Sequence, residues 1–261
     1  EELMRAFGRM VESLGGRYYT AEDVGSTLDD LSYVARETQY VAGLPGTSGN
    51  PSPVTGWGVY NAMKATAKRI WGSPELKGKK VAVQGCGNVG YALMQHLLEE
   101  GAIVYATDMF EDKIERAKKA GAQPVGMDEI YDLEADIFAP CALGAILNDD
   151  TIPRLKVKGI CGSANNQLLE PRHGKAVAAR GILYSPDFIV NGGGVINCAE
   201  EFAPGGYNQE LALKRAAGIY DILLKIFALA DEKEIEPYEA ANLYAEERIR
   251  KSLEQKRMYF K

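Results

Sequence analysis

The spacing of apolar positions predicts two helices at the start of the chain. Over residues 1–14 the apolar side chains recur at helical spacing, at Leu3, Phe7, Met10, Val11 and Leu14. Gly15-Gly16 ends this helix, and residues 17–20 then predict a short strand. Ser26 or Thr27 is expected to cap the second helix, because acidic residues follow in its first turn, at the positive end of the helix dipole.

Beyond these helices the pattern changes to alternating strands and helices. Residues 43–53, which are rich in Gly, Pro and Ser, form the clearest candidate hinge. The predicted helices span 55–71, 91–100, 111–120, 209–231 and 237–258. The predicted strands span 80–84, 103–107, 137–138, 159–161, 182–184 and, by a weaker pattern, 188–190. This alternation is typical of an α/β protein with a parallel sheet covered on both faces.

Composition and charge exclude several classes of function. The hydrophobic fraction of 46% and charged fraction of 25% are ordinary for a globular protein with a full core. A net charge of −6 argues against a nucleic-acid partner, which needs clustered Lys and Arg. The longest apolar stretches are strand-sized, so no membrane association is expected. Four cysteines without a CxxC pair and only two histidines predict no metal site and reduced thiols, which favours a cytoplasmic location.

A glycine-rich turn follows the strand predicted at 80–84. Gly85 permits a tight turn, Gly87 allows a close backbone approach to a diphosphate, and Gly90 allows the next helix to pack on the strand. Asn88 and Val89 complete the turn and begin a helix whose free N–H groups face the phosphates. The spacing GxGxxG alone is weak, but a strand before it and a helix after it predict a Rossmann-type, doubly wound dinucleotide-binding sheet.

An acidic residue lies where the ribose of a dinucleotide would be held. Asp108 ends the second predicted strand, where its carboxylate would accept hydrogen bonds from the ribose hydroxyls and repel a 2′-phosphate. No Arg follows directly in Met109-Phe110, although Lys113 is near enough to soften the preference. We therefore expect NAD(H) to be bound in preference to NADP(H). The alternative is a glycine turn in another kind of α/β protein.

Six spaced segments extend the prediction beyond the glycine turn. They are TAEDVG (20–25), SGNPSPVT (48–55), FAPCALGA (138–145), GSANNQL (162–168), PRHGK (171–175) and NGGGVIN (191–197). In this order they resemble the glutamate/leucine/phenylalanine/valine dehydrogenase family, and within it the leucine-type enzymes, over essentially the whole chain. The resemblance implies oxidative deamination of an L-amino acid to a 2-oxo acid and ammonia with reduction of NAD, and a homo-oligomer.

The resemblance also implies roles for individual residues. Asp23 matches the catalytic aspartate that exchanges protons with the substrate amine; the alternative is an Asp that only caps a loop. Thr55 matches a threonine that binds the nicotinamide carboxamide, and Ala142 would line the cofactor path. Asn166 and Asn191 match polar residues near the nicotinamide, although Asn is also a common turn residue.

The sequence says less about the pocket for the substrate side chain and about the roles of the two histidines. Ala21, Val195 and Cys198 match positions that line the substrate pocket; all are small or apolar, which suits a branched-chain amino acid and offers no cation for glutamate. An apolar pocket separates neighbours that differ by one methylene by only about 1–3 kcal/mol, so leucine, valine and isoleucine are not ranked. His96 is expected to be an exposed helix residue, and His173 a structural contact.

Two lysines of the family, one catalytic and one for the substrate carboxylate, match no lysine in this sequence. Lys64, Lys77 and Lys80 lie in helical or strand-edge contexts. The chain also opens inside a predicted helix without Met, so we expect a truncated form of such an enzyme, with NADH binding and little turnover. The alternatives are a non-catalytic NAD-binding module and a dehydrogenase that uses another group in place of the lysine.

The resemblance finally implies a division into domains. Residues 1–44 would be the remnant of a second α/β substrate domain, residues 45–234 the NAD-binding domain, and residues 235–261 a C-terminal helix that returns to the substrate domain.

Overall fold

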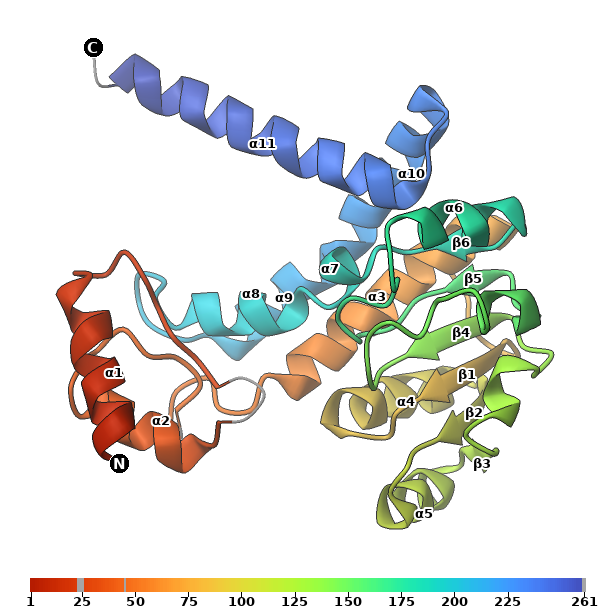
Figure 1. The fold of residues 1–261 in the computed structure, drawn as a ribbon, viewed down its shortest axis with the longest axis horizontal. Coiled ribbons are helices and arrows are strands. Elements are labelled where there is room, and N and C mark those ends of the chain that lie inside the picture. The colour runs from red at the N-terminus through yellow and green to blue at the C-terminus, as the bar shows by residue number, and fades with distance from the viewer. Residues whose placement is uncertain (23–25, 45, 260–261) are drawn as a thin grey trace.

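Six parallel strands form one sheet in the computed structural model, which describes residues 1–22, 26–44 and 46–259 and the side chains as far as residue 254. The strands are β1 (Lys80–Gln84), β2 (Ile103–Thr107), β3 (Gln123–Pro124), β4 (Ile137–Pro140), β5 (Gly159–Ile160) and β6 (Leu183–Tyr184). Their order is β3-β2-β1-β4-β5-β6 (Figure 1), which confirms the predicted Rossmann-type doubly wound sheet.

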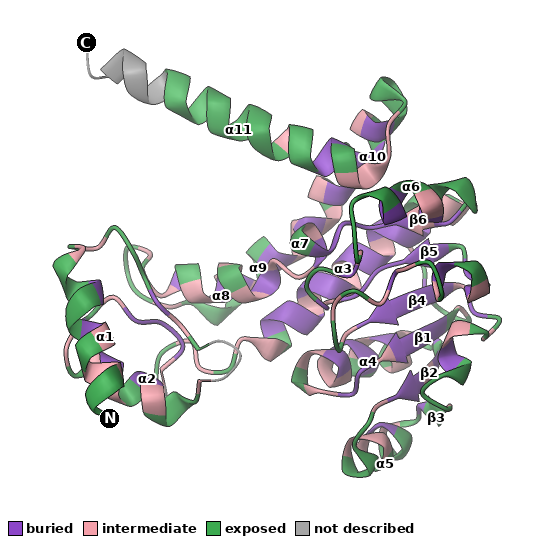
Figure 2. Ribbon diagram, in the orientation of Figure 1, coloured by how far each residue is buried: buried purple, intermediate pink, exposed green. Residues whose placement is uncertain are grey.

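Alternate residues of the central strands face two different cores. Val81 and Val83 of β1 pack in one cluster with α3 (Ser52–Trp71), α4 (Asn88–Glu100) and α10 (Ile219–Lys233). Ala82 of β1 and Phe138 of β4 pack in a second cluster with α6 (Arg172–Ala179) and the short helices η1 (Glu129–Tyr131) and η2 (Ile152–Arg154). Because side chains alternate along a strand, helices cover both faces, and Figure 2 shows the central strands β1, β4 and β5 mostly buried between them, whereas β3 at the edge is exposed.

The first 44 residues pack around a small core of their own. Helices α1 (Glu2–Ser13) and α2 (Leu28–Ala35) lie to one side of the sheet (Figure 1), around buried Leu31, Val34 and Val41. Thr27 caps α2 in a reciprocal box with Asp30, which confirms the predicted cap. The predicted strand at 17–20 is wrong except for Thr20, which forms a single parallel bridge with Val41.

Two predicted elements in the second half are wrong, and two helices were not predicted. Residues 188–190 belong to helix α7 (Asp187–Val190), whose first turn holds the acidic Asp187 at the positive end of the helix dipole. The predicted helix at 209–231 is two helices, α9 (Gln209–Ala217) and α10, which meet at Gly218, a poor helix former. Helix α6 and helix α8 (Gly193–Glu200) were missed.

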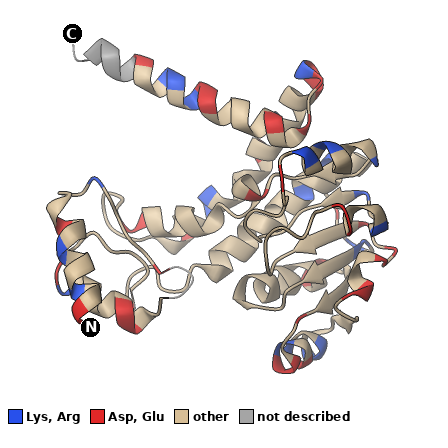
Figure 3. Cartoon of the chain, viewed as in Figure 1, with Lys and Arg blue, Asp and Glu red and all other residues tan. Residues whose placement is uncertain are grey.

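The remaining helices agree with the prediction to within a few residues. Helix α3 begins at Ser52, inside the predicted hinge, and α4 begins at Asn88 rather than at residue 91. Helix α5 (Glu111–Ala120) has the predicted bounds, and α11 (Pro237–Tyr259) projects from the body with most of its described side chains exposed (Figures 1 and 2). Charged residues of both signs lie on α1, α5 and α11 (Figure 3). Among the described residues, no helix has both the length and the apolar character of a membrane span.

His96 is less exposed than predicted. The centre of its ring lies 5.1 Å from that of Trp57 and 5.4 Å from that of Tyr60. Only 31% of the His96 side chain is exposed. Burial at this contact between α3 and α4 lowers the pKa of His96, although Glu99 acts in the opposite direction. The unfolded chain therefore binds a proton at this residue more readily than the folded chain does.

A pH-dependent loss of stability follows from the lowered pKa of His96. Because the folded pKa lies below the unfolded value, the contribution of His96 is present above the unfolded pKa and is lost as the pH falls through the folded pKa. His96→Phe keeps the aromatic contact and removes the titration. Urea unfolding at about pH 7.5 and about pH 5 should show a smaller loss of unfolding free energy for the variant than for the unaltered chain. Equal losses in the two proteins would contradict this prediction.

Candidate functional site

The turn after β1 is fixed by two glycines that have no room for a side chain. Gly85 has φ of +104°, and a Cβ there would lie 2.8 Å from the Cβ and the backbone N of Ala142. A Cβ on Gly90 would lie 2.0 Å from the carbonyl oxygen of Gly85. Any other residue at either position would displace backbone, so the fold itself requires these two glycines.

Gly87 differs, because the fold does not require it. It precedes α4 with φ of −62°, and a Cβ there would meet nothing within 4 Å. The space beside it leads to the N–H groups of Asn88, Val89 and Gly90, which open the helix and have no acceptor within it. Free N–H groups and the positive end of the helix dipole favour a bound anion. The three glycines therefore leave the N-terminus of α4 uncovered at the carboxyl end of β1.

A cavity of about 590 Å³ adjoins this turn. Large apolar side chains line it, and four of them are strongly exposed: Met109, Phe110, Met127 and Leu143. Asp108 lies in the wall, directly after β2, and its two carboxylate oxygens accept the N–H groups of Cys86 at 2.7 Å and Phe110 at 3.0 Å. Each oxygen keeps a lone pair for a further donor. The cavity therefore combines an apolar wall with a fixed carboxylate.

The loops after β4 and β5 lie side by side at the same edge of the sheet. The N–H of Ala145 donates to the carbonyl of Asn166 at 2.7 Å, and Leu147 and Leu168 form a parallel bridge. Asn166 has φ of +51°, a left-handed conformation that Asn tolerates. Ala142 reaches Gly85 from the first of these loops, so the loops join the glycine turn.

Asn191 contacts the loop after β5, and Thr55 lies where α3 meets α8. The Asn191 side chain donates to Asn165 Oδ1 at 2.5 Å and lies directly after α7, not after a strand as predicted. Thr55 is buried near the start of α3, where its hydroxyl donates to the carbonyl of Pro51 at 2.9 Å. A Cβ on Gly194 would lie 3.2 Å from this hydroxyl, so α3 and the start of α8 touch.

The residues predicted to line the substrate pocket are only partly enclosed. Val195 and Cys198 lie one turn apart on α8; the Val195 side chain is 76% exposed, whereas burial raises the pKa of the Cys198 thiol. Ala21 is half-buried. Asp23, the predicted catalytic residue, lies outside the described residues.

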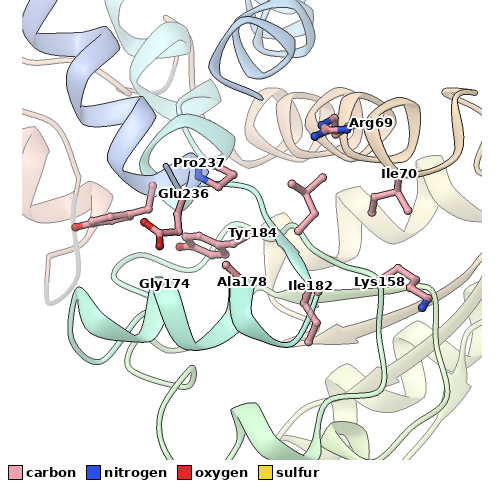
Figure 4. Close-up of a pocket in the computed structure, with 12 residues that line it drawn as sticks. Arg69, Ile70, Lys158, Gly174, Ala178, Ile182, Tyr184, Glu236 and Pro237 are labelled. Carbon is pink, nitrogen blue, oxygen red and sulfur yellow. The ribbon is translucent and has the colours of Figure 1, made fainter. Parts of the chain in front are cut away.

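A second cavity, of about 370 Å³, lies away from the glycine turn. It opens beside β6 between α3, α6 and the start of α11 (Figure 4). Arg69, Lys158 and Glu236 are among its lining residues, and none of the predicted site residues is. The described residues hold no group of three His, Cys, Asp or Glu side chains suited to a metal ion.

Several residues of the site were missed from the sequence. Glu201, just after α8, accepts the N–H groups of Gly43 at 2.8 Å and Ser48 at 3.2 Å, and also the Ser48 hydroxyl. It therefore ties the hinge segment to the end of α8. The apolar wall of the 590 Å³ cavity was missed too, although Met109-Phe110, two large apolar residues in a turn, was a usable signal.

Comparisons with known proteins agree with these features. The family model for glutamate/leucine/phenylalanine/valine dehydrogenase matches residues 46–110 and 107–257. The leucine dehydrogenase of Thermoactinomyces intermedius is 54% identical over 253 residues, which cover 95% of this chain and 69% of that enzyme. The leucine dehydrogenase of Geobacillus stearothermophilus is 53% identical, with 95% and 68% covered. The solved structure of L-tryptophan dehydrogenase from Nostoc punctiforme superposes with a TM-score of 0.87 at 45% identity, covering 97% of this chain and 73% of that one.

The different roles of Gly87 and Gly90 give a paired prediction. Gly87→Ala should change the free energy of unfolding by no more than about 1 kcal/mol, because its Cβ meets open space. The new methyl group should nevertheless weaken NADH binding at least about tenfold, because it occupies the path of the diphosphate. NADH fluorescence titration and urea unfolding measure the two effects.

Gly90→Ala is the matched control. It should lower the unfolding free energy by about 3 kcal/mol, because its Cβ would overlap the Gly85 carbonyl. If Gly87→Ala binds NADH as tightly as the unaltered chain, the diphosphate does not lie at this turn.

Proposed function

The chain belongs to the glutamate/leucine/phenylalanine/valine dehydrogenase family, and on this premise we propose that it serves the NAD-dependent oxidative deamination of a branched-chain L-amino acid. The products are the 2-oxo acid and ammonia. The observation that carries the proposal is the open space at Gly87 beside the free N–H groups of α4, within a chain 54% identical to a leucine dehydrogenase. L-Leucine is therefore the substrate to test first.

The cavity and turn suit a dinucleotide. A diphosphate at Gly87 would meet the N–H groups that open α4, and the adjoining 590 Å³ cavity has apolar walls for an adenine ring. Asp108 would accept the ribose hydroxyls with its remaining lone pairs. Bound NAD supplies the hydride acceptor of the reaction. Gly85, Asn88, Val89, Gly90 and Ala142 complete this part of the proposed site.

Asp108 also favours NAD over NADP. Its carboxylate is held in place by two backbone N–H groups, so it cannot turn away from a 2′-phosphate without losing both hydrogen bonds. Lys113 lines the same cavity, but its ammonium lies 4.3 Å over the Phe110 ring, where it partly offsets the repulsion. The Asp108 carboxylate bonds directly to Cys86 in the glycine turn, whereas the Lys113 ammonium lies over the Phe110 ring. We therefore expect the carboxylate to dominate and NAD to be preferred.

The amino-acid half of the proposed site rests on other residues. We propose that Thr55, Asn166 and Asn191 orient the nicotinamide; Asn166 lies in the loop after β5, and Asn191 bonds to its neighbour Asn165. Val195 and Cys198, with Ala21, would bound an aliphatic side chain. Asp23 would exchange protons with the substrate amine.

Turnover also needs a lysine that the sequence does not offer at a matching position. Such a lysine must polarise the carbonyl and exchange protons near neutral pH, which calls for an unpaired, pKa-lowered amine. Lys64 does not suit this role, because its ammonium lies 3.2 Å from the Glu100 carboxylate, between α3 and α4. We therefore propose that these 261 residues bind NADH but deaminate L-leucine slowly or not at all.

The division of the chain into functional parts is proposed on the same basis. The helices of residues 1–44 have their own small core, and α11 carries exposed apolar side chains at Leu243, Ile249 and Leu253. We propose residues 1–44 as part of a substrate domain, residues 45–234 as the NAD-binding domain and residues 235–261 as a helix that returns to the substrate domain.

The choice of cofactor is tested by Asp108→Asn. The variant keeps the shape of the side chain and removes its charge, so the preference for NADH over NADPH should fall by about tenfold. Fluorescence titration with both cofactors measures the ratio of the two dissociation constants. Glu210→Gln, which removes an equal charge from an exposed position on α9, should leave the ratio unchanged. An unchanged ratio in Asp108→Asn would remove Asp108 from the ribose site.

The function is tested by titrating NADH and assaying NAD reduction with L-leucine on the same sample. We expect saturable NADH binding and a rate several orders of magnitude below that of a family member that carries the catalytic lysine. Fast turnover would show that another group replaces the lysine. The absence of NADH binding would contradict the proposed function altogether.

A further inference from the structure

The peptide group between Cys86 and Gly87 is the part of the glycine turn that the packing of Gly85 and Gly90 does not fix. Gly85 and Gly87 flank Cys86, and glycine peptides rotate more freely than others. The N–H groups that would meet a diphosphate belong to this turn and to the start of α4. Contacts from outside the turn therefore help to set which way the peptide between Cys86 and Gly87 points.

Arg116, from the neighbouring helix α5, contacts two carbonyl groups of this turn. Its Nη2 donates to the Cys86 carbonyl at 2.8 Å and lies 3.4 Å from the Gly87 carbonyl. The guanidinium carbon lies 4.2 Å above the centre of the Tyr91 ring, so Arg116 also stacks on the first turn of α4. In the described part of the chain, no salt bridge includes Arg116, whereas Arg154 and Arg172 pair with carboxylates.

The Cys86 residue is thus held at both of its backbone groups. Its N–H donates to Asp108 at 2.7 Å, and its carbonyl accepts from Arg116 on the other side. The peptide bond is planar and trans, so the Cys86 carbonyl and the Gly87 N–H point in opposite directions. The same relation joins the Gly87 carbonyl to the Asn88 N–H. The Gly87 carbonyl also accepts the Tyr91 N–H at 2.9 Å within α4, so the peptide that Arg116 chiefly holds is the one between Cys86 and Gly87. Its N–H points away from the guanidinium.

We propose that Arg116 is a positioning residue for the diphosphate of the dinucleotide. It orients the Gly87 N–H through the Cys86 carbonyl on the other side of that peptide, and it adds a positive charge behind the start of α4. It does not need to touch the cofactor. Lysine cannot reproduce the planar fork or the stacking on Tyr91, so arginine is specifically suited to this position. This inference rests on the proposed function, because it assumes that a dinucleotide binds at the turn.

The test compares ligands with and without phosphates. Arg116→Met keeps most of the side-chain volume and removes the donors. We expect Arg116→Met to bind NADH and ADP about tenfold more weakly, because charge-assisted hydrogen bonds that orient the turn are lost. Adenosine, which has no phosphate, should bind with unchanged affinity. Arg116→Lys should recover part of the ADP affinity. Equilibrium titration by NMR measures all three ligands, and thermal unfolding measures the stability of each variant.

Arg180→Met is the matched control. Arg180 also donates to two backbone carbonyls, those of Ile152 and Leu155, but away from the glycine turn. Its loss should leave the affinity for all three ligands unchanged.

The outcomes separate this inference from the proposed function. Unchanged ADP affinity in Arg116→Met, or an equal loss for ADP and adenosine, overturns the positioning role and leaves the proposed function intact. If the unaltered chain binds neither NADH nor ADP, the proposed function and the role of Arg116 are both overturned.

Discussion

The contact between Gly90 and the Gly85 carbonyl is the constraint on which the site depends. A Cβ on Gly90 would lie 2.0 Å from that oxygen. Helix α4 therefore packs closer to the end of β1 than it could if residue 90 carried a side chain. Ala142 closes on the other side of Gly85, where there is again no room for a Cβ. The direction of α4, the position of its free N–H groups and the course of the loop after β4 are all set by these two contacts.

The parallel sheet explains why the other residues gather at the same edge. Every strand runs in one direction, so the segments after β1, β2, β4 and β5 all emerge together. Gly87, Asp108, Ala142 and Asn166 come from these four segments. Between β1 and β4 the order of strands reverses, which leaves a gap between the loops that a ligand can enter. Asn191, directly after α7, bonds to the loop after β5, and Thr55, near the start of α3, contacts the start of α8.

How much could be predicted from the sequence depends on how far apart along the chain the interacting residues lie. The turn at Gly85–Gly90 and the helix cap at Thr27 depend on neighbours in the chain, so local patterns identified them. Helices α6, α7 and α8 are eight residues long or shorter, too short for apolar spacing to separate a helix from a strand. The exposure of His96 depended on Trp57, which lies on another helix. The roles of Thr55 and Asn191 at the nicotinamide came from the resemblance to the family, because spacing in the sequence alone does not connect two residues so far apart, and they stay predictions.

The two kinds of glycine in the turn show why a sequence pattern describes a binding site incompletely. Gly85 and Gly90 are required by the fold, whereas Gly87 leaves space that the fold does not use. A protein could keep the first two and still bind no phosphate if its amides pointed elsewhere. The direction of those amides depends on Asp108 after β2 and Arg116 on α5, which hold Cys86 from opposite sides. The phosphate site is therefore built by three segments of the chain, and the glycine pattern describes only one of them.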